Sequence, residues 1–173
     1  MDSANLITIF TPCYNRAHLL SQLYQSLLEQ NATNFEWLIV DDGSTDTTKE
    51  VVANFISENK IPISYYNKPN GGKHTAINYG VQKAKGALFF IVDSDDFLSK
   101  EAVKLTTDAW VKIQDNKKIG GIIGLSEFTN GQLVGDAFLE DEWQLSFSDY
   151  YLKYHLRGDK SVAFKTNVMK EYP

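Results

Sequence analysis

The 173-residue sequence lacks several features that would assign it to particular classes of protein. Its only cysteine, Cys13, cannot form a disulfide within the chain, which fits a reducing compartment. No apolar stretch approaches the roughly 20 residues that cross a bilayer. The N-terminus, which carries Asp2, has no basic region followed by an apolar core, as a signal peptide has. Long basic runs are missing and the net charge is −5, so no nucleic-acid partner is expected. We therefore expect a cytoplasmic protein.

The composition is that of an ordinary globular protein. Hydrophobic residues make up 43% of the chain and charged residues 23%, and the length allows a substantial core. We expect a single domain over residues 1–173, without internal repeats or a low-complexity linker. The chain stops at "KTNVMKEYP", straight after a predicted short helix, and we interpret it as part of a longer protein.

Strands and helices alternate along the first two thirds of the chain. Short apolar runs predict strands at residues 6–10, 35–40, 63–66 and 87–92. Apolar residues at helical spacing predict helices at about 19–28, 47–56, 74–84 and 99–113. Thr47 and Glu50 have the spacing of a capping box, and Ser99 is a candidate N-cap for the fourth helix.

The second and fourth predicted strands are apolar throughout instead of alternating. This pattern is typical of strands that are buried on both faces of a parallel sheet. Alternating strands and helices then indicate a doubly wound α/β fold, with right-handed crossovers and helices on both faces of a mostly parallel sheet.

After about residue 119 the pattern becomes less regular. Residues 120–128 and 132–135 are predicted to form a hairpin or two strands. We expect a helix at 146–155 and a short strand at 161–165.

Polar or glycine-rich segments follow each of the first four predicted strands. In open α/β sheets, ligands bind at the carboxyl ends of the strands, so these segments should converge on one site. The segments are "TPCYNR", "DDGSTD", "NKPNGGKH" and "DSDD". Their shared position predicts a binding site at this edge of the sheet.

The fourth strand ends in three closely spaced acids, Asp93, Asp95 and Asp96. One interpretation is that they favour the N-terminus of the next helix. The other is a hard divalent cation, Mg²⁺ or Mn²⁺, held by one or two carboxylates together with a substrate phosphate. Because a cation relieves the mutual repulsion of the acids, we prefer the metal interpretation.

The other strand ends offer groups that suit a nucleotide. Asp41 and Asp42 could begin a turn, but two acids exceed what a turn needs, and one could accept a hydrogen bond from a base N–H. Tyr14 could stack on a base or be a half-buried core residue. Lys73, in a flexible glycine-rich loop, could act as a point charge against a diphosphate.

The segments "ITIFTPCYNR", "FEWLIVDDGSTD", "NGGKHTAINYG" and "FFIVDSDDFL" together resemble the nucleotide-sugar-binding half of family 2 glycosyltransferases. The resemblance covers roughly residues 5–100, with the segments in the order and spacing of the family. It implies the GT-A fold, a Rossmann-like, mostly parallel sheet. It also implies a donor-binding half at 5–100 and part of the acceptor side at 101–173.

The resemblance also implies which residues bind the donor and the metal. The implied donor-binding residues are Thr11, Pro12, Tyr14, Asn15, Arg16, Asp41, Asp42, Lys73, Asp93 and Ser94. In this set Pro12 and Tyr14 flank the base, with Tyr14 stacked on it, while Asp42 reads the uracil edge and Lys73 approaches the base or phosphates. The metal, Mg²⁺ or Mn²⁺, falls to Asp95 or Asp96, and the sequence leaves that choice open.

The implied activity is transfer of a sugar from a nucleotide-diphosphate sugar, most simply a UDP-sugar, to an acceptor hydroxyl with inversion. The acceptor would be a saccharide or a lipid-linked saccharide of the cell envelope. Asp141 and Asp159 are the candidate general bases, although each could simply belong to a turn and the base could lie beyond Pro173. A C-terminal continuation could associate with the inner face of the membrane.

Three other classes of protein share some of these sequence features. A receiver domain would need an acidic pair after the first strand and a lone aspartate after the third, which the sequence does not have. A nucleotidyltransferase would need a basic, glycine-rich loop after the first strand, where "TPCYNR" stands. A non-catalytic fragment that binds nucleotide-sugars remains an alternative.

Overall fold

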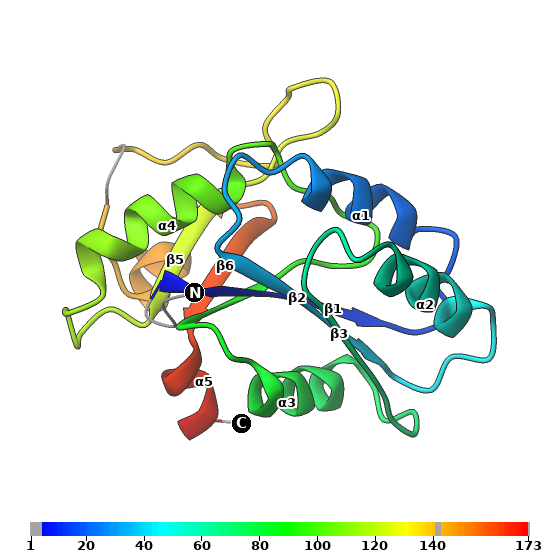
Figure 1. Ribbon diagram of the computed structural model, residues 1–173. Coiled ribbons are helices and arrows are strands. Elements are labelled where there is room, and N and C mark those ends of the chain that lie inside the picture. Colours follow the sequence, from blue (N-terminus) through cyan, green and yellow to red (C-terminus); the bar gives the residue numbers. More distant parts are fainter. Residues whose placement is uncertain (1–4, 141–142, 173) are drawn as a thin grey trace. The chain divides into compact units, whose positions relative to one another are not determined.

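A computed structural model describes residues 5–140 and 143–172 (Figure 1). A six-stranded sheet has the strand order β3-β2-β1-β4-β6-β5. The strands are β1 Ile7–Cys13, β2 Phe35–Asp41, β3 Ile63–Asn67, β4 Leu88–Ile91, β5 Gly121–Leu125 and β6 Lys160–Lys165. The helices are α1 Leu20–Leu28, α2 Thr48–Glu58, α3 Lys73–Lys83, α4 Ala102–Ile113 and α5 Thr166–Glu171, with one π-helical turn, η2, at Asp149–Lys153.

The first four strands confirm the parallel sheet expected from the sequence. β1 pairs in parallel with β2 on one side and with β4 on the other, and β2 pairs in parallel with β3. All seven residues of β2 are buried, as the largely apolar run predicts, and they include the acids Glu36 and Asp41. The parallel arrangement brings the carboxyl ends of these four strands to one edge of the sheet.

Helices cover both faces of the sheet (Figure 1). Side chains such as Ile9 and Trp37 pack with α1, α2 and α4 on one face. On the other face Phe10 and Leu38 pack with α3, and Met169 of α5 lies against the same cluster. Because successive strand residues point to opposite faces, each strand contributes to both cores. The fold is therefore a mostly parallel α/β sheet between two layers of helices.

Neither predicted cap forms its side-chain hydrogen bond, because side chains from other positions take that role. Thr47 is the N-cap residue of α2, as predicted, but the predicted position of Ser99 at α4 is wrong. The Thr47 side chain makes no cap hydrogen bond at α2, whereas the Asp46 carboxylate accepts from the Thr48 amide at 3.0 Å and from its hydroxyl at 2.5 Å. At α4, Ser99 is not the N-cap, and the side chain of Gln30, after α1, accepts from the Val103 amide at 3.0 Å. The second partner is remote in sequence, so no local pattern indicated it.

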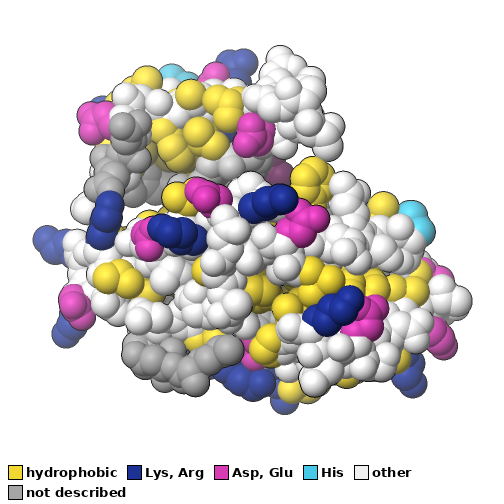
Figure 2. Space-filling model, turned by 45° about the horizontal axis from the view of Figure 1, so that its top comes forward, with side chains coloured by type: hydrophobic (Ala, Val, Ile, Leu, Met, Phe, Trp, Pro, Cys, Tyr) yellow, Lys and Arg dark blue, Asp and Glu magenta, His cyan; other side chains and the backbone are white. Residues whose placement is uncertain are grey.

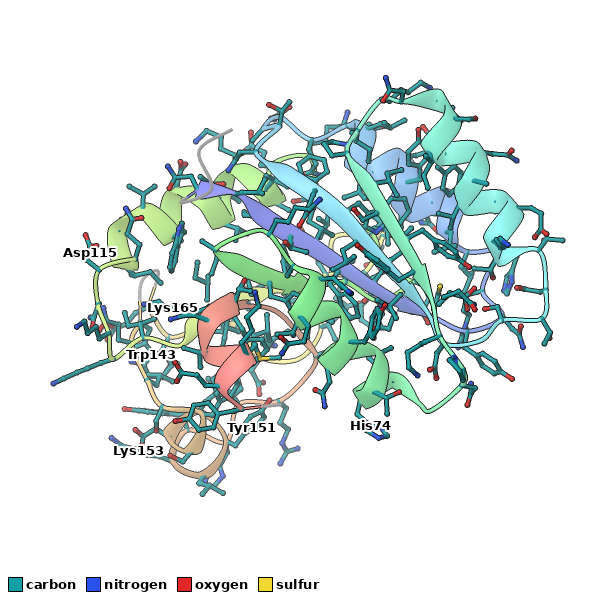
Figure 3. All side chains as sticks on the ribbon, turned by 60° about the horizontal axis from the view of Figure 1, so that its bottom comes forward. His74, Asp115, Trp143, Tyr151, Lys153 and Lys165 are labelled. Carbon is teal, nitrogen blue, oxygen red and sulfur yellow. The ribbon has the colours of Figure 1, made fainter. Side chains whose placement is uncertain are left out.

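A buried lysine closes the C-terminal end of α4. Lys165, at the end of β6, donates to the backbone carbonyls of Gln114 and Asn116 at 3.3 and 2.8 Å (Figure 3). Its ammonium group also lies 5.4 Å from the centre of the Trp110 ring. A cation at this position satisfies carbonyls that the helix leaves unpaired.

The region after residue 119 is less regular than the hairpin expected there. β5 forms, but Glu127 and Leu133 make only an isolated antiparallel bridge, and no strand is assigned at 132–135. The predicted helix at 146–155 is reduced to the π-helical turn η2. The predicted strand at 161–165 is present as β6.

The internal packing divides the chain into two compact units. The larger unit contains the residues up to Ile122 together with those from Ala163 onward, and the smaller is Ile123–Val162. On the face shown in Figure 2, acidic and basic side chains are interspersed instead of forming a block of one sign. Within the described ranges, no helix is both long and apolar enough to span a membrane.

Candidate functional site

A pocket of about 290 Å³ lies where β1, β2 and β4 end. Its lining comes from the ends of these strands and from the first turns of α3. The lining residues are Pro12, Cys13, Tyr14, Arg16, Asp42, Lys73, Ala76, Asp93, Ser94 and Asp95. Most of the residues that the sequence implied for donor and metal binding are thus brought together in one cavity.

Tyr14 and Pro12 form one side of the pocket, directly after the buried part of β1. The Tyr14 side chain is 48% exposed, so its ring is not a core residue and one face is available to a ligand. Pro12, at the end of β1, is partly buried and lines the same cavity. An accessible aromatic ring beside a rigid proline is suited to stacking on a flat base.

Asp42 is a buried carboxylate with several partners from its own chain. Lys68 forms an ion pair with it, and the backbone amides of Gly71 and Gly72 donate to it at 3.0 and 2.6 Å. Burial acts to raise the pKa of Asp42, but the hydrogen bonds from Lys68, Gly71 and Gly72 outweigh it and hold the pKa below its usual value. Asp42 is therefore ionised at neutral pH, and the ammonium group of Lys68 balances its charge.

Asp41, the neighbouring acid, is turned away from the pocket. It is only 1% exposed, and its two oxygens accept from the Ser44 amide at 2.8 Å and from the Tyr65 hydroxyl at 2.5 Å. Burial, followed by the hydrogen bond to Asp41, raises the pKa of Tyr65. Asp41 therefore joins β3 to the loop after β2, and it does not line the cavity.

Two other implied donor residues also have structural contacts outside the pocket lining. Thr11 is fully buried, and its hydroxyl accepts from the Trp37 indole N–H at 3.0 Å. Asn15 has a left-handed backbone with φ 54°, and its side-chain oxygen accepts from the Thr45 amide at 2.8 Å. The Asn15 amide in turn donates to the Ser44 hydroxyl at 2.8 Å. Asn15 thereby holds the loops after β1 and β2 together.

Lys73 and Asp93 form an ion pair in the lining of the pocket. Lys73 Nζ lies 2.6 Å from Asp93 Oδ2, with the two side chains 56% and 39% exposed. The other oxygen, Asp93 Oδ1, is buried and has no hydrogen-bond partner among the described residues. Ser94, which follows, is 6% exposed and also lines the cavity. This side of the pocket thus combines an accessible cation with an incompletely satisfied carboxylate.

The other two acids after β4 differ in position. Asp95 is exposed and lines the pocket, whereas Asp96 is exposed and does not belong to the lining. No group of three or more His, Cys, Asp or Glu side chains suited to a metal occurs in the described part of the chain. Mg²⁺ sites, however, commonly use only one or two carboxylates together with substrate phosphates. The unpartnered oxygen of Asp93 and the carboxylate of Asp95 fit that smaller requirement.

Cys13 lies in the pocket wall but is poorly suited to nucleophilic chemistry. It is 3% exposed, and burial, followed by the charges of Asp41, Asp46 and Asp42, raises the pKa of its thiol. A thiolate is the reactive form of cysteine, and this environment disfavours it.

The candidate bases belong to a different part of the chain. Asp141 lies outside the described residues. Asp159 is an exposed residue of the smaller unit, and its carboxylate accepts from the Lys160 amide at 3.0 Å. Nearby, Asp136 accepts from the Arg157 amide at 2.8 Å, and His155 has a left-handed backbone with φ 52°.

Lys68 is the residue at this site that sequence reasoning missed. It follows β3 directly, in the segment "NKPNGGKH", whose glycines and Lys73 are the more obvious candidates for ligand binding. The available signal was its position at the same sheet edge as Asp42, directly after the strand that pairs with β2. A basic residue one strand away from a buried acid is a natural partner for it.

Comparison with known proteins identifies the family. Residues 8–154 match the model described as Glycosyl transferase family 2. The chain belongs to this family. A chondroitin synthase of Pasteurella multocida (strain Pm70) is 38% identical over 107 residues, which cover 62% of this chain and 11% of the synthase. The glycosyltransferase GlyA of Streptococcus pneumoniae serotype 4 is 30% identical over 138 residues, covering 78% of this chain and 20% of GlyA.

Solved structures agree with this assignment. Residues 1–349 of S. aureus TarS, solved alone and in complex with UDP, match with TM-scores of 0.73 and 0.72 and 27% identity. Each match covers 96% of this chain and 48% of that of TarS. This chain of the family therefore has the GT-A fold expected from its sequence. It spans about a tenth of the synthase and about half of the TarS fragment.

Proposed function

We propose that this chain forms the donor site of a metal-dependent glycosyltransferase that transfers a sugar from a UDP-sugar to an acceptor hydroxyl. The observation that carries the proposal is the pocket in which Tyr14, Asp42, Lys73, Asp93 and Asp95 converge. The TarS complexes with UDP and with UDP-GlcNAc support a nucleotide-sugar as the ligand.

The base of the donor binds between Tyr14 and Asp42. The half-exposed ring of Tyr14 stacks on the base, with Pro12 at its side. Asp42, which is ionised and buried, accepts a hydrogen bond from an N–H at the edge of the base. Stacking supplies affinity for any base, whereas the carboxylate selects bases that present a donor.

The diphosphate binds beside Lys73 and Arg16, both of which line the same pocket. When the bond between the sugar and the diphosphate breaks, negative charge accumulates on the leaving group. Lys73 is a point charge placed to stabilise this charge, provided that it releases Asp93 when the donor binds.

Asp93 and Asp95 are the residues that would hold Mg²⁺ or Mn²⁺. A bound divalent cation supplies positive charge to the leaving diphosphate. The buried oxygen of Asp93 without a partner among the described residues and the pocket-lining carboxylate of Asp95 provide the oxygen ligands. Asp96, outside the lining, is the less suitable of the two acids implied by the sequence.

Transfer with inversion further requires a general base on the face of the sugar opposite the leaving group. Asp141 and Asp159 remain the candidates within this chain. The acceptor is proposed to be a saccharide or lipid-linked saccharide, handled in the cytoplasm or at the inner face of the membrane. The chondroitin synthase among the relatives supports a role in polysaccharide synthesis.

The proposal is tested by measuring how UDP stabilises the protein against thermal unfolding in Mn²⁺ and in EDTA. At a ligand concentration of a hundred times Kd, binding stabilises the folded state by about 2.7 kcal/mol. We expect stabilisation of this size in Mn²⁺ and much less in EDTA. Equal stabilisation in both would contradict a shared metal site, and no stabilisation in either would contradict donor binding. Comparing donor hydrolysis with donor binding then separates an enzyme from a binding fragment.

A further inference from the structure

The loop between β3 and α3 folds over Asp42 and surrounds it with donors. The side-chain amide of Asn70 donates to the backbone carbonyl of Asp42 at 2.9 Å. The amides of Gly71 and Gly72 donate to the Asp42 carboxylate, with Gly71 shared between its two oxygens at 3.0 and 3.2 Å. The carboxylate is therefore held from one side by backbone groups that cannot move independently of the loop.

Lys68 completes this arrangement from within the same loop. Its ammonium group pairs with Asp42 Oδ1 and also donates to the Pro69 carbonyl at 2.7 Å and the Thr75 hydroxyl at 2.8 Å. A lysine ammonium has three donors, so all of them are used. The Lys68 side chain is 16% exposed, and the pocket lining includes Lys73 but not Lys68. Lys68 thus contacts the carboxylate from behind the pocket and has no donor left for a ligand.

The partners of Asp42 restrict what it can offer to a ligand. An ionised carboxylate has about four acceptor positions. Lys68, Gly71 and Gly72 direct three N–H donors at it, and Gly71 is shared between the two oxygens, so that each oxygen has two contacts. Asp42, which lines the pocket, therefore meets a ligand with a carboxylate whose orientation is already fixed.

We propose that Lys68 is a positioning residue of the donor pocket, which fixes the Asp42 carboxylate in the orientation that selects the base. Uracil carries one N–H between two carbonyls on its pairing edge and fits one fixed acceptor. Cytosine presents a ring nitrogen lone pair at the same place, which a fixed carboxylate repels. Without Lys68 the carboxylate gains an open position and rotational freedom, so both affinity and base selectivity decline.

This inference rests on the proposed function, and its test separates base recognition from phosphate binding. Dissociation constants are measured by calorimetry in Mn²⁺ for UDP, CDP and inorganic pyrophosphate. For Lys68→Met we expect UDP to bind about tenfold more weakly, the effect of losing one charge-assisted hydrogen bond. Pyrophosphate, which has no base, should bind within about twofold of wild type, and the preference for UDP over CDP should fall.

Two further variants provide the reference points. Lys85→Met removes a lysine that lies 3.1 Å from Glu36, another buried acid, but outside the pocket lining, so all three ligands should bind as in wild type. Tyr14→Ala removes the stacking ring, so UDP and CDP should both weaken while pyrophosphate does not. If the preference for UDP over CDP falls in Lys68→Met but not in Tyr14→Ala, the loss of selectivity is due to Lys68 and not to a general weakening of base binding.

Thr75→Val keeps the test decisive if Lys68→Met does not fold. It removes one acceptor of the Lys68 ammonium, and with it the hydroxyl that donates to the Gly72 carbonyl at 2.8 Å, while retaining the size of the side chain. Because Lys68 and Gly72 both hold Asp42 and the Lys68–Asp42 pair itself remains, the loss in UDP affinity should be smaller than in Lys68→Met, about two- to fivefold. Unchanged UDP affinity and selectivity in the folded variants would overturn the inference alone. A parallel loss of UDP and pyrophosphate would also overturn it, since Lys68 would then only maintain the loop. Failure of the wild-type protein to bind UDP would overturn the proposed function as well.

Discussion

The acids at the end of β2 and the acids that follow β4 lie at the same edge of the sheet but have opposite environments. Asp41 and Asp42 are 1% and 4% exposed, and each accepts at least two hydrogen bonds from its own chain. Asp93 keeps one buried oxygen without a partner in the described ranges, and Asp95 is exposed. The first group is held in place by several partners from its own chain, whereas the second is only partly satisfied.

This difference fits the two tasks proposed for the pocket, which are recognition of the base and binding of a metal with the diphosphate. A base must be distinguished from other bases, which requires a rigid acceptor whose orientation is fixed before binding. A metal and a diphosphate bring their own charges, so carboxylates and a lysine that are only partly satisfied can exchange partners when these ligands arrive. The Lys73–Asp93 pair, with both side chains accessible, is suited to such an exchange.

The largest effect on stability is expected when one of the buried acids at the end of β2 is replaced. Asp41→Ala removes the acceptor of the Ser44 amide and of the Tyr65 hydroxyl, and should lower the free energy of unfolding by about 3 kcal/mol. Urea denaturation without ligand measures this loss. The matched variant Asp95→Ala changes an exposed acid and should stay within about 0.5 kcal/mol of wild type. Similar losses in both variants would remove the distinction between the two groups.

An intermediate effect is expected for the acids that follow β4, which are only partly satisfied without a ligand. Asp93→Asn should abolish the additional stabilisation by UDP in Mn²⁺, lowering it by roughly 2 kcal/mol to the EDTA level. Thermal unfolding with and without UDP measures it.

The control is Asp108→Asn, which alters an exposed Lys104–Asp108 pair of similar geometry on α4. Because this pair is outside the pocket lining, its loss should leave the Mn²⁺ effect intact. A preserved Mn²⁺ effect in Asp93→Asn would exclude Asp93 as a ligand.

The smallest effect is expected in the pH dependence of the unfolding free energy at acidic pH. The pKa of Asp42 is lower in the folded protein than its ordinary value of 3.8, so the folded state binds this proton less readily than the unfolded state. Its contribution to stability is complete above that ordinary value and is lost as the pH falls through the lower folded pKa. Unfolding free energies measured from about pH 5 to about pH 3 should therefore decline less steeply in Asp42→Asn. Asp46, whose pKa is also lowered, should still contribute to the pH dependence in this variant. Parallel curves of unfolding free energy against pH for wild type and Asp42→Asn would contradict the assignment to Asp42.

Much of the fold could be predicted from the sequence because its signals are local. The apolar run at 35–40 became β2, buried along its whole length, and the helical spacing at 19–28 became α1. Strand ends follow from these elements, and parallel strands bring their ends to one edge. The position of the pocket therefore followed from the alternation of strands and helices.

The individual roles of site residues were harder to predict, because each depends on a partner remote in sequence. Thr11 and Tyr14 both stand near the end of β1, yet Thr11 contacts Trp37 in the core and Tyr14 lines the pocket. Asp41 and Asp42 are adjacent, but successive side chains point in opposite directions, so only Asp42 reaches the cavity. Sequence proximity could not separate the members of either pair.

The sequence by itself determined the family, the order of the strands and helices, and the sheet edge at which polar groups gather. Hydrophobic periodicity and each of the four motif segments contain that information within a short stretch of the chain. Only the tertiary structure decided which acids are satisfied internally and which are left for a ligand. Lys68 reaches Asp42 across 26 residues of chain, and Gln30 caps α4 from the end of α1. Such hydrogen bonds depend on where the backbone places two distant segments, and no local pattern encodes that distance.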